Sequence, residues 1–102
     1  MSTREHIRNI VIKYTTGETK IISGVELANK LGVTVSAVNK WKNGESTPSV
    51  DLFEEMCRIF KISIHELLGI DNGTFVSQED KELLDKIKKD PALYEYICKV
   101  VK

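Results

Sequence analysis

The sequence predicts an all-α fold. Apolar residues recur at helical spacing through most of the 102 residues, small polar residues precede several of these runs, and glycines follow several of them. The length suits one domain, since domains commonly hold about 100–200 residues. Apolar residues at 41% and charged residues at 29% are typical of a globular protein. The composition therefore argues against a disordered tail and against a membrane protein.

The first helix is expected between Arg4 and Tyr14. Its apolar residues follow the i, i+3, i+4, i+7 pattern of one helix face. They are Ile7, Ile10, Val11 and Tyr14. Turn-type residues at 15–20 end this helix. A second interpretation stays open here, in which residues 10–14 and 19–22 form a short β-hairpin, because short apolar runs fit both structures.

Two short helices joined by a tight turn are expected next. Ser23 caps the first of them, and Glu26 three residues later completes a capping box. Gly32 ends it, because glycine accepts the left-handed backbone of a helix C-terminus. Thr34 then provides a new N-cap, and the second helix stops at residues 43–44. The residues expected in the core are Leu27, Ala28, Leu31, Val38 and Trp41.

Two further helices complete the expected five. One opens at Pro48-Ser49 and carries a wide apolar stripe. A second capping box, Ser63 with Glu66, starts a short helix that ends at Gly69. The stripe of the longer helix consists of Leu52, Phe53, Met56, Cys57 and Phe60.

A helical extension is expected after the fifth helix. The predicted organisation is a domain over residues 1–70, a linker over residues 71–76 and the extension over residues 77–102. Ser77 caps its first helix, and Asp90-Pro91 begins the second. The apolar residues of the extension must be buried against some surface. They are Leu83, Leu84, Ile87, Leu93, Ile97, Val100 and Val101.

Charge and residue types exclude several functions. The formal net charge is zero, although residues 1–49 hold seven lysines or arginines against four glutamates. This mildly basic half permits a polyanion-binding face without demanding one. Neither a run of about 20 apolar residues nor a secretory signal is visible, so the cytoplasm is the expected location. The two cysteines are too few for a zinc site, and His6 and His65 are expected on the surface, so neither metal nor cofactor is expected.

The most specific signal lies in residues 24–43. Two helices that cross steeply over a short turn need a small residue where their backbones meet, and Ala28 supplies it. They also need a residue with positive φ four positions later, and Gly32 supplies that. The apolar positions seat both helices on a common core, which leaves one polar face of the second helix exposed. A helix with such a face fits the DNA major groove.

These residues resemble the Xre or phage-repressor class of helix-turn-helix domains. The matching segments are Glu26-Leu27-Ala28, Leu31-Gly32-Val33-Thr34, Ala37-Val38-Asn39-Lys40-Trp41-Lys42-Asn43-Gly44, Pro48-Ser49 and Phe60-Lys61-Ile62-Ser63-Ile64-His65-Glu66-Leu67-Leu68-Gly69. The resemblance covers about residues 21–69, nearly half of the chain. It implies a five-helix, lambda-repressor-like domain in a DNA-binding transcription regulator. Such regulators are commonly repressors of phage or mobile-element type.

The resemblance also assigns DNA contacts. The recognition helix corresponds to residues 34–42. Its outward residues that match base-contacting positions are Val35, Ser36, Asn39 and Lys40. The positions that match phosphate contacts are Ser23, Gly24, Thr34, Lys42, Asn43 and Ser46. The chain departs from the family at Gly24, where glutamine is frequent, and at Lys42, where glutamate is frequent. The link between the first two helices is also longer than usual.

The expected partners follow from the resemblance. A protein that reads two half-sites of double-stranded DNA about 34 Å apart needs a two-fold partner, so a homodimer on an inverted repeat is expected. Residues 77–102 are then the expected dimer element, and packing on their own domain is the alternative. A different function also stays open: a protein-interaction module, such as an antitoxin or anti-repressor, with a toxin or anti-repressor protein as its partner. An enzyme is not expected, because the sequence has neither a glycine-rich phosphate loop nor a nucleophile-and-base arrangement.

Overall fold

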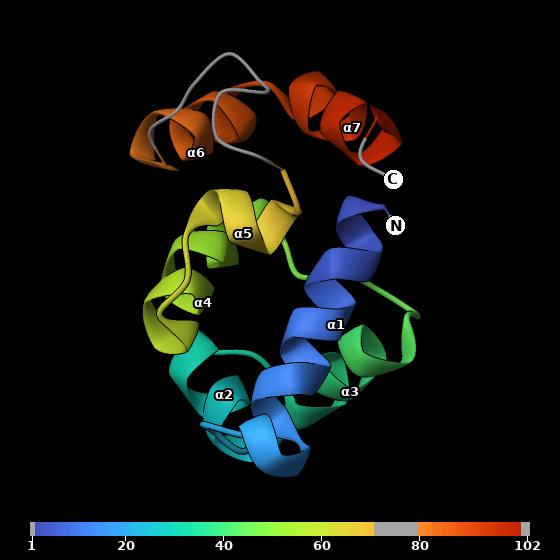
Figure 1. Cartoon of the computed structure of the whole chain (residues 1–102), viewed down its shortest axis with the longest axis vertical. Helices are drawn as coiled ribbons and strands as arrows, with labels where there is room; N and C mark the ends of the chain where they lie inside the picture. The colour runs from blue at the N-terminus through green and yellow to red at the C-terminus, as the bar shows by residue number, and fades with distance from the viewer. Residues whose placement is uncertain (1, 71–79, 101–102) are drawn as a thin grey trace.

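The computed structural model describes residues 2–70 and 80–100, and these residues form an all-α fold (Figure 1). They contain no strand, which confirms the predicted fold class. The helices are α1 (Thr3–Thr15), α2 (Gly24–Leu31), α3 (Val35–Asn43), α4 (Phe53–Phe60), α5 (Ile64–Leu68), α6 (Asp80–Lys89) and α7 (Pro91–Val100). Two short 3-10 turns, η1 (Gly17–Thr19) and η2 (Val50–Leu52), precede α2 and α4. None of the described helices is long and apolar enough to cross a membrane.

Four of the predicted helix starts are confirmed by their capping hydrogen bonds. The hydroxyl groups of Ser23, Thr34 and Ser63 each accept a hydrogen bond from the backbone N–H three residues further along, at 3.0 Å. Asp90 Oδ1 accepts from the Ala92 N–H at 3.1 Å, at the start of α7. The cap predicted at Ser77 lies outside the described residues. Local side-chain chemistry therefore sets these boundaries.

The hairpin interpretation of the first segment is wrong. α1 continues to Thr15, whose hydroxyl donates to the carbonyl of Val11 at 2.6 Å, and the chain then turns through η1. The N–H groups of Ile21 and Ile22 both donate to the single carbonyl of Tyr14, at 2.9 and 3.2 Å. Two donors on one acceptor close a turn, whereas a strand pair needs an alternating ladder.

The helix predicted from Pro48-Ser49 starts later than expected. The Leu52 N–H donates to the Ser49 carbonyl at 3.0 Å, a three-residue spacing that makes η2, and α4 begins only at Phe53. The helix ends at Lys61, which has a positive φ of 59°. A second correction concerns His65, which is 3% exposed rather than on the surface. It lies on α5, a five-residue helix packed against α1, α4 and α6, with four of its five residues buried.

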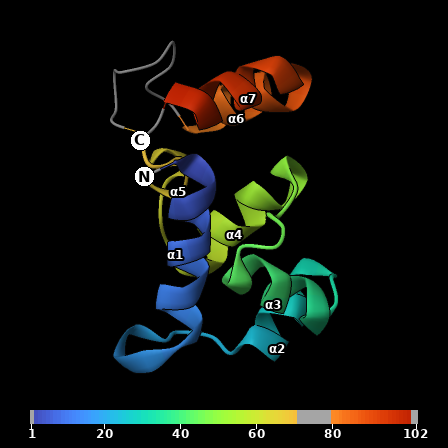
Figure 2. The same ribbon diagram turned by 90° about the vertical axis from the view of Figure 1, so that its right-hand side faces the viewer.

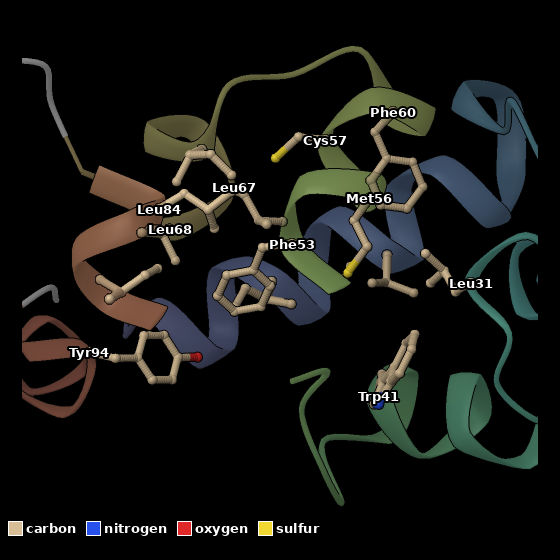
Figure 3. Packing of buried hydrophobic residues seen from close by; sticks show 14 of the residues in the cluster. Leu31, Trp41, Phe53, Met56, Cys57, Phe60, Leu67, Leu68, Leu84 and Tyr94 are labelled. Carbon is tan, nitrogen blue, oxygen red and sulfur yellow. The ribbon is translucent and has the colours of Figure 1, made fainter. Parts of the chain in front are cut away.

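One hydrophobic core runs through the described chain. It extends from Trp41 of α3 through Phe53 and Met56 of α4 to Leu84 of α6 (Figure 3). The core positions predicted for α2 and α3 are confirmed, since all five of those side chains are buried. Their spacing of three and four residues turns one face of each helix inward.

The extension packs on its own chain, which corrects the prediction that its apolar stripe pairs with a second copy. Within the single chain, α6 lies against α5 and η2, and α7 lies against α1 (Figures 1 and 2). The predicted dimer residues Leu83, Leu84, Ile87 and Ile97 are buried there and present no surface to a partner. Leu93 is half-buried, Val100 is exposed, and Val101 lies outside the described residues.

The physical reason is an apolar surface that the first five helices leave open. Phe53, Leu67 and Leu68 are fully buried in a core that includes the inward faces of α6 and α7. The Phe53 ring meets Tyr94 of α7 edge-on, with 5.7 Å between ring centroids. Burial of apolar area is favourable whether the covering surface belongs to the same chain or to another. The extension therefore completes the core of its own chain.

Polar contacts hold α7 beside the start of α1. Arg4 of α1 forms an ion pair with Glu95 at 2.7 Å, and its guanidinium carbon lies 5.9 Å from the centroid of the Tyr94 ring. Burial raises the pKa of the Tyr94 phenol and the pKa of the Cys98 thiol, so both groups are neutral at neutral pH. The ion pair is exposed, so apolar packing contributes most of the docking energy.

Candidate nucleic-acid interface

α2 and α3 form a tight pair at one end of the molecule (Figure 2). Ala28 is 1% exposed in the core that the two helices share, where a larger side chain would have no room. Gly32 has a φ of 71° and ends α2, and the Val33 N–H returns to the Ala28 carbonyl at 3.0 Å. This closure turns the chain within two residues to Thr34, which caps α3. The helix pair is therefore built as its sequence predicts.

The outward face of α3 carries the four predicted base-contacting residues. Val35, Ser36, Asn39 and Lys40 are all exposed, while Val38 and Trp41 anchor the opposite face of the helix in the core. The four side chains thus share one surface of a helix whose position is fixed from behind. Amide, hydroxyl, ammonium and aliphatic groups on such a face match the donors, acceptors and methyl groups of base edges.

The predicted phosphate-contacting residues surround this face. Ser23 and Gly24 begin α2, Thr34 precedes α3, and Asn43 and Ser46 follow it. Thr34, Asn43 and Ser46 are exposed, whereas Ser23 and Gly24 are half-buried. The oxygens of Ser23 and Thr34 already accept capping bonds, so each hydroxyl keeps its proton for a further acceptor.

The two departures from the family pattern prove to be one feature of the structure. A Cβ atom added at Gly24 would lie 3.9 Å from the Nζ atom of Lys42 and 3.8 Å from Cγ1 of Val38. The lysine ammonium therefore lies beside the first turn of α2, next to the place that a side chain at residue 24 would use. None of the ion pairs found among the described residues involves Lys42. An ammonium group beside the positive end of a helix makes a region that favours anions.

Arg8 is a basic residue at this surface that the sequence did not predict. Its Nη1 atom lies 3.4 Å from the position of a Cβ atom at Gly44, whose φ is 77°. The guanidinium thus lies beside the turn that carries Asn43 and Ser46. A hollow of about 300 Å³ between α1 and this turn is lined by Arg8, Trp41 and Ser46, among others. The helix-turn-helix spacing gave no signal for Arg8, because the residue precedes the motif on a separate helix.

The described residues contain no group of three or more histidine, cysteine, aspartate or glutamate side chains placed to hold a metal ion. The interface is instead a surface of exposed polar side chains flanked by cations. Glu26 and Glu45 also lie near it, on the first turn of α2 and after α3. The local charge therefore depends on where each cation points rather than on a large excess of basic residues.

Comparison with known proteins finds similarity in the same segment of the chain. A family model described as helix-turn-helix matches residues 18–67. The transcriptional repressor RstR of a cryptic CTXphi phage in Vibrio cholerae is 27% identical over 70 residues, which are 69% of this chain and 59% of that repressor. No solved structure matches the chain significantly. The family match includes α2 and α3 and leaves out α1, α6 and α7.

Proposed function

We propose that this protein is a sequence-specific DNA-binding transcriptional repressor, because a helix-turn-helix family model matches residues 18–67. One observation carries the proposal: α3 presents four exposed side chains on one face while its other face is anchored in the core. A rigid helix with an exposed polar face is what major-groove recognition requires. The resemblance to a phage repressor supports repression as the direction of control.

Each side chain of the α3 face has a role in this proposal. Lys40 donates to O6 and N7 of a guanine, and Asn39 forms paired hydrogen bonds with an adenine. Val35 contacts the methyl group of a thymine, and Ser36 donates to or accepts from a neighbouring base edge. These contacts carry the sequence information.

The backbone phosphates are bound by groups around that face. The amides at the start of α2, near Ser23 and Gly24, point toward an anion, and the ammonium of Lys42 lies beside them. Thr34, Asn43 and Ser46 add contacts from the ends of α3, and Arg8 adds a cation from α1. Such contacts fix the register of the protein on the duplex without reading its sequence.

The proposed regulator acts in the cytoplasm as a homodimer on an inverted repeat. Two recognition helices related by a two-fold axis read two half-sites one helical turn apart, about 34 Å. Occupation of such an operator blocks transcription by excluding the polymerase from it.

Lys40→Ala and Lys42→Ala are expected to weaken DNA binding in two different ways. Loss of the base contact of Lys40 should cost about 1–3 kcal/mol on the cognate site and relax the preference at one position of each half-site. Loss of Lys42 should weaken all duplexes alike and reduce the salt dependence by about one phosphate contact per half-site. Titration of cognate and scrambled duplexes at several salt concentrations measures both effects. Equal weakening of both duplexes by Lys40→Ala would remove Lys40 from base reading.

Arg8→Ala should also weaken cognate and scrambled duplexes alike, with a lower salt slope. The matched control is Lys13→Ala, which removes an exposed cation from the same helix at a position whose ammonium lies over the Tyr14 ring, 5.2 Å from the ring centroid. The control should leave the salt slope unchanged. An Arg8→Ala variant with the slope of the native protein would show that α1 does not reach the phosphates.

Selection of bound sequences from a randomised duplex library tests the proposed function as a whole. The expected product is a short inverted repeat whose half-sites are one helical turn apart. A protein that enriches no sequence and does not retard duplexes at low salt would not be a DNA-binding regulator.

A further inference from the structure

The hollow between α1 and the turn after α3 has the makeup of a small-molecule site. Its volume is about 300 Å³, and its floor includes the buried side chains of Ile7, Trp41 and Pro48. Its rim is polar and includes Arg8 and Glu45, which are exposed. Ligand sites in proteins are commonly concave and mostly apolar, with a few polar groups and volumes of roughly 300–1,000 Å³. The hollow therefore fits a small molecule at the lower end of that range.

The indole N–H of Trp41 is an unused hydrogen-bond donor at this hollow. The side chain is 4% exposed, and its N–H makes no hydrogen bond with another described residue. The described residues hold a single fully covered side-chain oxygen or nitrogen without a partner, the hydroxyl of Tyr94. The Trp41 nitrogen is therefore not sealed in the core, and Figure 3 shows it at the end of the ring that lies away from Met56. Such a donor is available to an acceptor atom that enters the hollow.

Charged side chains at the hollow are unpaired as well. Arg8, Glu5 and Glu45 line it, and none of the ion pairs among the described residues involves them. Arg4, the other arginine of the lining, is already paired with Glu95. The hollow thus offers one guanidinium that donates and two carboxylates that accept hydrogen bonds. A ligand that matches all three groups carries both an anionic and a cationic group.

We propose that this hollow binds a free α-amino acid with an apolar side chain, as a ligand that regulates DNA binding. The ligand carboxylate accepts hydrogen bonds from the Arg8 guanidinium and the Trp41 N–H. The ligand ammonium donates to the carboxylates of Glu5 and Glu45. The apolar side chain of the ligand lies on the floor of the hollow, where its own apolar area leaves water. A simple anion would leave the two carboxylates unmatched, and a simple amine would leave the guanidinium unmatched.

A ligand in the hollow reaches groups that are proposed to bind DNA. The N–H groups of Glu45 and Ser46 donate to the Lys40 carbonyl at 2.9 and 3.4 Å, so the turn beside the hollow closes the end of α3. Arg8 is one of the proposed phosphate contacts, and a ligand carboxylate competes with a phosphate for its guanidinium. Occupation of the hollow therefore lowers the affinity for DNA. This consequence rests on the proposed function, whereas the binding of the ligand does not.

Intrinsic fluorescence tests ligand binding directly, because Trp41 is the only tryptophan in the sequence. The probes are L-leucine and L-phenylalanine at concentrations up to about 10 mM. The matched controls for leucine are isocaproate, which lacks the ammonium, and isoamylamine, which lacks the carboxylate. At least one amino acid should change the Trp41 emission saturably, and the two controls should bind about tenfold more weakly than leucine or less. No response to either amino acid, or equal affinity for leucine and isocaproate, would overturn the proposal.

Variants of the exposed charged residues assign the contacts. Arg8→Ala should weaken amino-acid binding about tenfold or more, because the ligand carboxylate loses its cation. Glu5→Gln combined with Glu45→Gln should weaken amino-acid binding similarly and leave the response to isocaproate unchanged. The matched control is Lys13→Ala, which removes an exposed cation of α1 that does not line the hollow and should bind as the native protein does. Native affinity in Arg8→Ala would overturn the proposed site.

Titration of the duplex recovered by selection tests the regulatory role. A saturating amino acid should weaken binding to this duplex about tenfold and lower the salt slope by about one phosphate contact per half-site. Arg8→Ala should show no such effect, because it lacks the group for which ligand and phosphate compete. If the amino acid binds but leaves the affinity for DNA unchanged, the regulatory role is wrong. If the protein binds no DNA at all, the proposed function fails, and the fluorescence titration still decides whether the hollow binds the amino acid.

Discussion

Ala28→Leu is expected to lower the free energy of unfolding by about 1–3 kcal/mol or more, because added methylene groups in a filled core force the neighbouring elements apart. Ala28 is 1% exposed within the core that α2 and α3 share, and its carbonyl accepts the hydrogen bond that closes the turn. The total stability of such domains is only about 5–15 kcal/mol, so the loss is large. No nucleotide contact is altered, so any loss of DNA binding would follow from unfolding.

Urea denaturation followed by circular dichroism measures this effect. Val25→Leu is the matched control, since it adds one methylene group on the same helix at an exposed position and should change stability by less than about 0.5 kcal/mol. An Ala28→Leu variant as stable as the control would mean that the backbones of α2 and α3 do not pack closely at this residue. The helix-turn-helix geometry would then be wrong.

Truncation after Ile70 is expected to cost about 3 kcal/mol or more. The truncated chain would expose part of the side chains of Phe53, Leu67 and Leu68, which are fully buried in the complete core. Full burial of one such side chain contributes about 1.5–3 kcal/mol, and three are affected. The sequence alone suggested that residues 1–70 hold a core of their own, whereas the structure makes the extension part of that core.

Thermal and urea unfolding of residues 1–70 and of the full chain measure the cost. The matched control is Arg4→Ala in the full chain, which removes the exposed ion pair with Glu95 and should cost less than about 1 kcal/mol. Equal stability of the truncated and full chains would show that α6 and α7 contribute little to the core. If Arg4→Ala lowered the free energy of unfolding as much as the truncation does, the ion pair rather than apolar packing would hold the extension in place.

Much of the candidate interface was readable from the sequence because its determinants are local. Ser23, Thr34 and Ser63 cap helices through bonds that span three residues, and Gly32 ends α2 through its own φ. The period of the apolar residues then fixes which face of α3 is buried. Base-facing residues follow from the remaining face, so the recognition helix could be located before any tertiary contact was known.

Individual contacts between segments that are distant in the sequence could not be predicted in this way. The approach of Arg8 to Gly44 and the burial of His65 join residues whose distance depends on how helices cross. The position of Lys42 beside Gly24 depends equally on the angle between α2 and α3. Sequence spacing within one helix carries no information about such angles, so these features emerge only when the helices are packed.

The sequence by itself determined the all-α class, most helix boundaries, the helix-turn-helix pair and the outward face of α3. Tertiary structure alone decided where the apolar stripe of the extension goes. An apolar stripe such as Leu83, Leu84 and Ile87 indicates that one face of a helix must be buried. It does not indicate against which surface, because that depends on which apolar surface lies within reach. Here the first five helices leave an apolar surface open around Phe53, and docking within one chain avoids the entropy cost of association. The stripe is therefore buried inside its own chain, while the less apolar outer face of α7 remains exposed.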